Sequence, residues 1–239
     1  MLVHNLNDVR QLLDNAARAA DRPPPRLLAV AKSQPAAAVA ELAAAGQRAF
    51  GENYVQEAAA RRTELATMGP AAAGLEWHLI GHLQSNKARD AAALFDWVQT
   101  VDRAKLVSAL ARHRRGDQLP LNVLIQVNID DEASKHGCAP DAIAGLAREV
   151  AAAPALRLRG LMAIPAPSPE PGRRREAFHR MRACFDELQH ARPHIDTLSM
   201  GMSDDFPLAI AEGATMVRIG TALFGARPGK WIDRARPVL

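Results

Sequence analysis

Short apolar runs recur along the chain, and each is followed by a polar turn and then by an Ala-rich, helix-prone stretch. The centre of each run is almost continuously apolar, which is typical of parallel strands that are covered on both faces. We find eight such runs, at residues 27–32, 47–51, 76–81, 97–101, 121–129, 157–164, 195–200 and 215–220. The alternation predicts eight strand–helix units.

The stretches between the runs carry helix-terminating residues. Pro35 and Gly46 bracket an Ala-rich helix. Asn53 and Gln56 have the spacing of a capping box, which predicts a helix start at this point. One further helix, from Val3 to Ala20, precedes the first strand.

Eight units in 239 residues predict a single α/β domain over residues 1–239, a closed (β/α)8 TIM barrel with an extra N-terminal helix. A doubly wound open sheet is the alternative, because a sequence does not show closure. The Pro-rich stretch 163–172 is interpreted as a long loop after the sixth strand, since the alternation resumes beyond it.

Composition and charge narrow the function classes. The formal charge is +4, and the basic runs at 112–115 and 173–175 are interpreted as solvated helix ends. Aromatic residues make up only 4% of the chain, so a stacking surface for nucleic acid is not expected. Acidic residues interrupt the first 22 positions, and no apolar run approaches the roughly 20 residues of a membrane span. We expect a cytoplasmic protein without nucleic-acid or membrane partners.

A barrel carries its chemistry in the loops at the carboxyl ends of its strands. Lys32 ends the apolar run LLAVAK. It is either a solvated charge at a strand end or an amine in a partly desolvated cavity. Desolvation lowers the pKa of an amine and makes it a nucleophile that can form a Schiff base.

Small, hydroxyl-bearing turns follow the last two strands. The first contains Gly201 and Ser203, and the second is Gly220-Thr221. Loops at these two positions frequently bind phosphate in such barrels, although either glycine alone would also suit an ordinary tight turn. A reactive Lys32 opposite a phosphate site suggests an aldehyde-bearing phosphate ester, and pyridoxal 5′-phosphate fits this description.

Arg218 lies two residues before Gly220, so the two share one face of the last strand. Its guanidinium either faces the cofactor ring or pairs with a carboxylate below the rim. Facing the pyridine nitrogen, a permanently protonated arginine would discourage ring protonation and make the ring a poorer electron sink.

The segment 77–87 is rich in polar groups. His82 and Asn86 could hold the ring edge or a substrate carboxylate, or Asn86 could cap the next helix. His78 lies in the middle of a strand and is interpreted as a core histidine. Cys138 and Cys184 form neither a metal motif nor a disulfide framework, and we expect no metal site.

Several motifs together resemble one family, the pyridoxal phosphate homeostasis proteins, also called YggS-like or proline synthase co-transcribed proteins. The resemblance runs from Leu27 to Gly225. Ala31 and His136 depart from the residues common in that family, and we expect neither to touch a cofactor contact. The motifs are LLAVAKSQP, FGENYVQEA, WHLIGHLQSNK, VLIQVNIDDEASKHG, LRGLMAIP, SMGMSDD and MVRIGTALFG.

The resemblance implies a fold like the N-terminal domain of alanine racemase and a covalent attachment of pyridoxal 5′-phosphate to Lys32 as an internal aldimine. It also implies that Arg218 faces the pyridine nitrogen and that Asn53 lies beside the ring. The residues that would hold the phosphate are Ser203, Gly220 and Thr221 with the backbone of Met200, Gly201 and Met202.

The family functions as a cofactor carrier that buffers pyridoxal phosphate, affects amino-acid and keto-acid balance, and has no settled catalytic activity. Racemases with this fold need a second domain, whereas only about a dozen residues follow Gly225, among them Arg227, Lys230 and Arg236. We therefore expect an open cavity, a monomer, and apoenzymes as acceptors. The alternatives are a weak racemase or eliminase acting on small amino acids and a cofactor-free Schiff-base aldolase. Tyr54 is not expected to act as a base.

Overall fold

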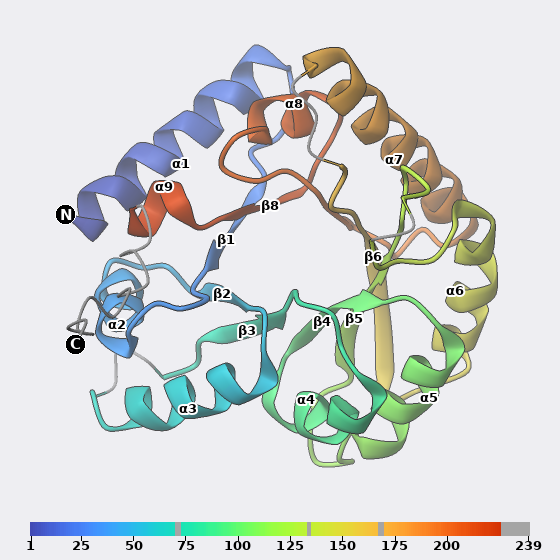
Figure 1. Cartoon of the computed structure of the whole chain (residues 1–239), viewed down its shortest axis with the longest axis horizontal. Coiled ribbons are helices and arrows are strands. Elements are labelled where there is room, and N and C mark those ends of the chain that lie inside the picture. The colour runs from blue at the N-terminus through green and yellow to red at the C-terminus, as the bar shows by residue number, and fades with distance from the viewer. Residues whose placement is uncertain (70–72, 133–134, 167–169, 226–239) are drawn as a thin grey trace, which may run out of the picture.

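Eight parallel strands close into a barrel, and helices surround it (Figure 1). The structure is a computed structural model that describes residues 1–69, 73–132, 135–166 and 170–225. The strands follow one another around the barrel in sequence order, and β1 pairs with both β2 and β8. This closure confirms the predicted barrel and excludes the open sheet.

Each predicted apolar run overlaps one strand, and the polar residues at the ends of the runs lie in the loops. The strands are β1 (Arg26–Val30), β2 (Ala49–Glu52), β3 (Glu76–Leu79), β4 (Trp97–Val101), β5 (Leu121–Gln126), β6 (Leu156–Met162), β7 (Thr197–Ser199) and β8 (Met216–Ile219). The α-helices are α1 (Leu2–Ala19), α2 (Ala36–Ala44), α3 (Val55–Ala66), α4 (Ala88–Leu94), α5 (Ala104–His113), α6 (Ile143–Ala151), α7 (Pro171–Ala191), α8 (Phe206–Ala211) and α9 (Thr221–Phe224). The 3-10 turns η2 (Ser85–Lys87) and η3 (Pro140–Ala142) precede α4 and α6.

The predicted capping box at Asn53 is wrong. The N-cap of α3 is Tyr54, and no side chain caps this helix. The side chain of Asn53 lies instead in the loop that follows β2, at the carboxyl end of the barrel, where it lines a cavity.

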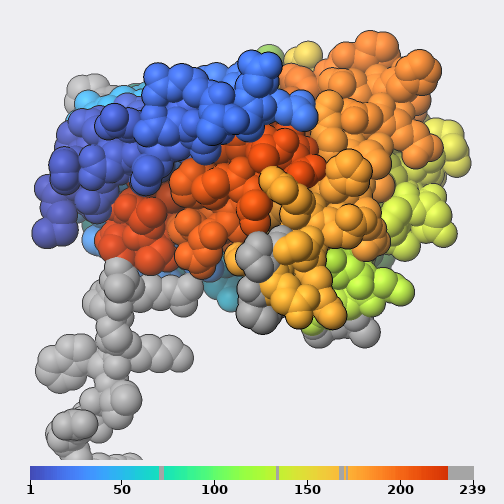
Figure 2. Space-filling view, turned by 90° about the horizontal axis from the view of Figure 1, so that it is seen from above, coloured from blue at the N-terminus to red at the C-terminus, as the bar shows by residue number. Residues whose placement is uncertain are grey.

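Helix α1 covers the seam where the first and last strands of the barrel meet. Its buried residues Leu6, Val9, Leu13 and Ala17 form a stripe at helical spacing. The helix packs against α8, α9 and α2, and Figure 2 shows it (blue) alongside the C-terminal elements of the barrel (red). Asn5 Nδ2 donates a hydrogen bond to the carbonyl of Leu223, 2.9 Å away, and so fixes α9.

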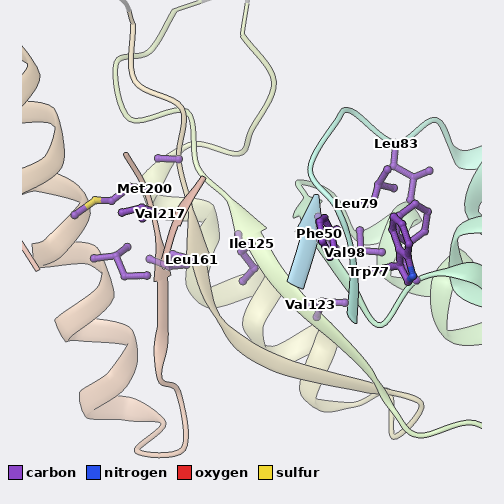
Figure 3. Close-up of a cluster of buried hydrophobic side chains, with 14 of the residues drawn as sticks. Phe50, Trp77, Leu79, Leu83, Val98, Val123, Ile125, Leu161, Met200 and Val217 are labelled. Carbon is purple, nitrogen blue, oxygen red and sulfur yellow. The ribbon is translucent and has the colours of Figure 1, made fainter. Parts of the chain in front are cut away.

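The main hydrophobic core lies between the barrel and its helices. Phe50, Trp77, Leu79, Val98 and Val217 point outward from the strands into this core (Figure 3). The side chains that alternate with them fill the barrel interior, where two small apolar clusters form. These clusters are Leu28, Ala49, Ile80 and Met216, and Trp97, Leu124 and Met162.

The close approach of β6 and β7 requires a glycine at Gly160, which has a φ of +151°. A Cβ at this position would lie 1.9 Å from the carbonyl oxygen of Thr197. We predict that Gly160→Ala lowers the free energy of unfolding by about 2 kcal/mol or more, since backbone strain and overpacking add. Urea unfolding measures the change. Gly116→Ala, which meets open space, is the control, and equal stabilities of the two variants would contradict the prediction.

Candidate functional site

A cavity of about 360 Å³ opens at the carboxyl ends of the strands, where barrels of this kind carry their chemistry. The volume is typical of a site for a small molecule. Eight of the ten residues predicted for the site line it: Lys32, Asn53, His82, Met202, Ser203, Arg218, Gly220 and Thr221. The other lining residues are Val30, Gln34, Ile80, Gly81, Gln126, His136, Ile164, Asp204 and Gly225.

Lys32 lies two residues beyond β1 and is half-buried. A buried ion pair supports its loop: Arg61 Nε lies 2.6 Å from Glu52 Oε1, and Arg61 also donates to the carbonyl of Gln34. Burial raises the pKa of the Glu52 carboxyl, and the Arg61 guanidinium opposes this rise. The pair thus joins the end of β2, helix α3 and the lysine loop.

The turn after β7 differs in part from the prediction. The side chain of Met200 is buried in the main core, and its N–H donates to the carbonyl of Met216. The N–H of Met202 donates to Asp205 Oδ1 at 2.7 Å. Gly201, with a φ of +91°, packs against Ala209 and does not line the cavity. The N–H groups of Met200 and Met202 thus have acceptors within the protein, while Met202 itself lines the cavity. Phosphate binding by the backbone of this turn stays a prediction.

Ser203 and Thr221 place hydroxyl groups on this side of the cavity, as predicted. Thr221 is the first residue of α9, and Gly220 is its N-cap. Within the described chain, Leu223 is the first residue of α9 whose N–H donates to a backbone carbonyl, that of Gly220. The side of the cavity formed by β7 and β8 therefore combines hydroxyl groups with backbone donors, a combination that suits an anion.

Arg218 is 3% exposed and lines the same cavity. Its Nη1 donates to the carbonyl and the hydroxyl of Ser199, both at 2.8 Å, and its Nη2 donates to the carbonyl of Ala163 at 2.8 Å. No carboxylate of the described residues pairs with it, so the alternative of an ion pair below the rim is wrong. Burial lowers the pKa of the guanidinium to about 10, and the group stays protonated near neutral pH.

A chain of hydrogen bonds runs from Arg218 through the barrel interior. Ser199 Oγ donates to Gln99 Oε1 at 2.7 Å, and Gln99 Nε2 lies 2.9 Å from His78 Nδ1. Because Gln99 donates to Nδ1, the proton of the neutral imidazole is on Nε2, which faces Glu76. Every donor therefore points away from Arg218 and toward the Glu76 carboxylate.

The series of hydrogen bonds ends at an anionic group, the Glu76 carboxylate. Burial alone would raise the pKa of Glu76, but the hydrogen bond to His78 and the neighbouring Arg26 lower it to about 2. Arg26 Nη2 lies 2.7 Å from the carboxylate. His78 is fully buried and stacks on Trp97 with ring centroids 5.0 Å apart, which confirms its prediction as a core histidine.

Another part of the cavity rim, after β3 and β5, carries two stacked imidazoles. The ring centroids of His82 and His136 lie 3.7 Å apart. Partial burial and the neighbouring His136 lower the pKa of His82. The expectation that His136 touches no predicted contact is therefore wrong. Asn86 belongs to η2, not to the cavity lining.

Gln126 is a lining residue that the sequence analysis missed. It is 6% exposed, and its Nε2 donates to the carbonyl of His136. Its Oε1 is buried and has no partner among the described residues. An unsatisfied buried acceptor in a cavity is costly, which indicates a ligand or solvent donor at this position. A lone glutamine within the apolar run LNVLIQVNI was the available signal.

A second cavity, of about 350 Å³, lies at the amino ends of the strands. Its arginines are engaged in structural contacts. Arg10 donates to the carbonyls of Ala45 and Gly46, and Arg26 pairs with Glu76. Polar groups at this end of a barrel serve stability, so we place the functional site at the carboxyl ends.

The fold and the lysine-bearing cavity together indicate one family of barrel proteins. A family model described as "Alanine racemase, N-terminal domain" matches residues 4–228, and the chain belongs to this family. No described helix is long and apolar enough to cross a membrane.

Individual relatives indicate a smaller group within this family. The chain is 52% identical over 228 residues to the pyridoxal phosphate homeostasis protein of Escherichia coli K12, covering 95% of this chain and 97% of that protein. It is 51% identical over 228 residues to the protein of the same name from Pseudomonas aeruginosa, covering 95% and 96% of the two chains.

Solved structures agree with this assignment. PipY of Synechococcus elongatus with pyridoxal phosphate bound is 38% identical, with a TM-score of 0.81 over 94% of this chain and 100% of that chain. Alanine racemase of Corynebacterium glutamicum is 22% identical, with a TM-score of 0.64 over 98% of this chain and 63% of that chain, and shares the fold.

The buried His78 makes stability depend on pH. Burial lowers its pKa below the usual 6.5, so the unfolded chain gains a proton that the native state excludes. This contribution to stability is complete above about pH 6.5 and is lost as the pH falls toward the native pKa. We predict that the free energy of unfolding decreases between about pH 7 and about pH 5 by up to about 1.4 kcal/mol per pH unit.

Urea unfolding of His78→Gln at several pH values tests this prediction. The profile of this variant should be flatter than that of the wild type, whatever its absolute stability. His113→Gln, at an exposed position, should keep the wild-type slope. Identical slopes for His78→Gln and the wild type would show that His78 is not the group responsible.

Proposed function

We propose that this protein binds pyridoxal 5′-phosphate in the cavity at the carboxyl ends of the strands and acts in the homeostasis of this cofactor. The observation that carries the proposal is one cavity that is lined by a lysine, by two hydroxyl groups and by a buried guanidinium. The names of its relatives support the same function.

The residues present fit this group. Lys32 is the amine for covalent attachment, and Ser203 and Thr221 with the start of α9 would hold the phosphate. Three of the five N–H groups of Arg218 are used inside the barrel, which leaves two for the ring nitrogen. Asn53 and His82 would flank the ring. The unsatisfied Gln126 Oε1 offers an acceptor to the same ligand.

A carrier role agrees with the chemistry of this set. When bound, the cofactor supplies a reactive aldehyde and an electron-withdrawing ring. A protonated arginine at the ring nitrogen weakens the ring as an electron sink. Tyr54 is 61% exposed at the N-cap of α3 and is not positioned as a catalytic base. We infer that the protein is a cytoplasmic monomer of one domain that releases the cofactor to apoenzymes.

The attachment residue is tested by colour. Protein isolated with bound cofactor should be yellow, and Lys32→Ala should lose this visible absorbance because no other amine occupies that position. Absorption spectroscopy of the purified proteins measures the loss. Lys105→Ala, an exposed lysine of α5, is the matched control and should stay yellow. A Lys32→Ala protein that stays yellow after dialysis would overturn the assignment.

The phosphate side is tested separately. Ser203→Ala combined with Thr221→Ala should weaken cofactor binding, since one hydrogen bond to a charged group contributes about 1.5–3 kcal/mol. Equilibrium dialysis against free pyridoxal 5′-phosphate measures the dissociation constant. Ser108→Ala, on the exposed side of α5, controls for the loss of a hydroxyl. Unchanged affinity in the double variant would place the phosphate elsewhere.

A further inference from the structure

Three potential metal ligands meet at the rim of the cavity: His82 after β3, Asp102 after β4 and His136 after β5. Each offers one nitrogen or oxygen atom, and these atoms all lie within 4.8 Å of one another. The spacing of these three residues does not indicate a metal site, because they are far apart in the chain. The parallel barrel brings them together, since the ends of β3, β4 and β5 are adjacent.

We propose that His82, Asp102 and His136 form a binding site for a divalent transition-metal ion of the Zn²⁺ type. Two imidazoles and one carboxylate are a donor set that suits this class of ion. The site shares His82 with the residues to which we assign the cofactor, whereas the lysine, the guanidinium and the hydroxyl groups lie outside it. It goes beyond the proposed function and does not depend on it.

Asp102 is prepared to act as a ligand. Its side chain is only 10% exposed, and its Oδ1 forms an ion pair with Arg103 Nη1. Oδ2 points toward His82, whose Nδ1 lies 4.0 Å away. A carboxylate that is fixed through one oxygen and presents the other is the usual arrangement in metal sites, where an outer partner orients the ligand. Arg103 also donates to the carbonyl of Leu83, which connects the loops after β3 and β4.

The two histidines have the freedom that binding requires. Both are exposed at the rim, and their rings stack on each other. Ligand atoms around a tetrahedral Zn²⁺ ion lie about 3.3 Å apart, given bond lengths near 2.0–2.2 Å. Binding therefore requires the two rings to rotate so that their nitrogens come closer together, and their exposure at the rim permits this. Three protein ligands leave a fourth position open toward the cavity.

Calorimetric titration of the full chain with Zn²⁺ alone tests the proposal. We expect one ion per chain, with affinity at least about tenfold weaker in His136→Ala and in His82→Ala, because even outer partners of metal ligands contribute that much. The titration is repeated in the Lys32→Ala background. Zn²⁺ binding by the Lys32→Ala protein would show that the metal site does not require cofactor attachment. The metal proposal can therefore hold even if the proposed function fails.

His4→Ala is the matched control, because His4 and Asp8 form an exposed histidine–carboxylate pair with a 3.3 Å separation on α1. This variant should bind Zn²⁺ as the wild type does. The proposal is overturned if the wild type binds no Zn²⁺, if His136→Ala and the wild type bind with equal affinity, or if His4→Ala removes the binding. As a second measurement, Zn²⁺ should raise the thermal midpoint of the wild type but not that of His136→Ala.

Discussion

A guanidinium charge buried inside the barrel is the constraint that organises the site. Removing such a charge from water is expensive unless its donors are satisfied. Arg218 meets this requirement with two backbone carbonyls and one hydroxyl, all fixed by the strands. A carboxylate, Glu76, lies at the other end of a polar chain, where it pairs with Arg26. The interior between them therefore cannot be filled with the aliphatic layers that are usual in such barrels.

This arrangement divides the site into a fixed part and an adjustable part. The fixed part is the guanidinium, whose contacts are Ser199 of β7 and Ala163, the residue that follows β6. The adjustable part is formed by loops, which carry the lysine and the hydroxyl groups. Of these loops, the one after β1 has its own buried support in the Glu52–Arg61 pair. The carrier function that we propose would use this combination, because the ring position would have to be reproducible while the attachment stays reversible.

Sequence periodicity predicted most of the fold and the strand-derived part of the site. Arg218 and Gly220 share a face because strands alternate, and His78 is buried for the same reason. The amide of Met202 could not be assigned from sequence, since its acceptor depends on how the turn folds back onto Asp205. The His82–His136 stack was equally hidden, because the pairing of neighbouring loops is set by tertiary structure.

The direction of the polar chain supports the carrier function that we propose for this barrel. Every hydrogen bond from Arg218 to Glu76 is donated toward the carboxylate, so the chain stabilises the guanidinium in its protonated form. With a pKa of about 10, the guanidinium does not pass its proton to a pyridine nitrogen near neutral pH. A cofactor whose ring nitrogen faced this guanidinium, as we propose, would keep its aldehyde chemistry and would be a weaker electron acceptor. In the function that we propose, reversible attachment to Lys32 would require only the aldehyde chemistry, so storage and release of the cofactor would be compatible with the charge that shapes the barrel interior.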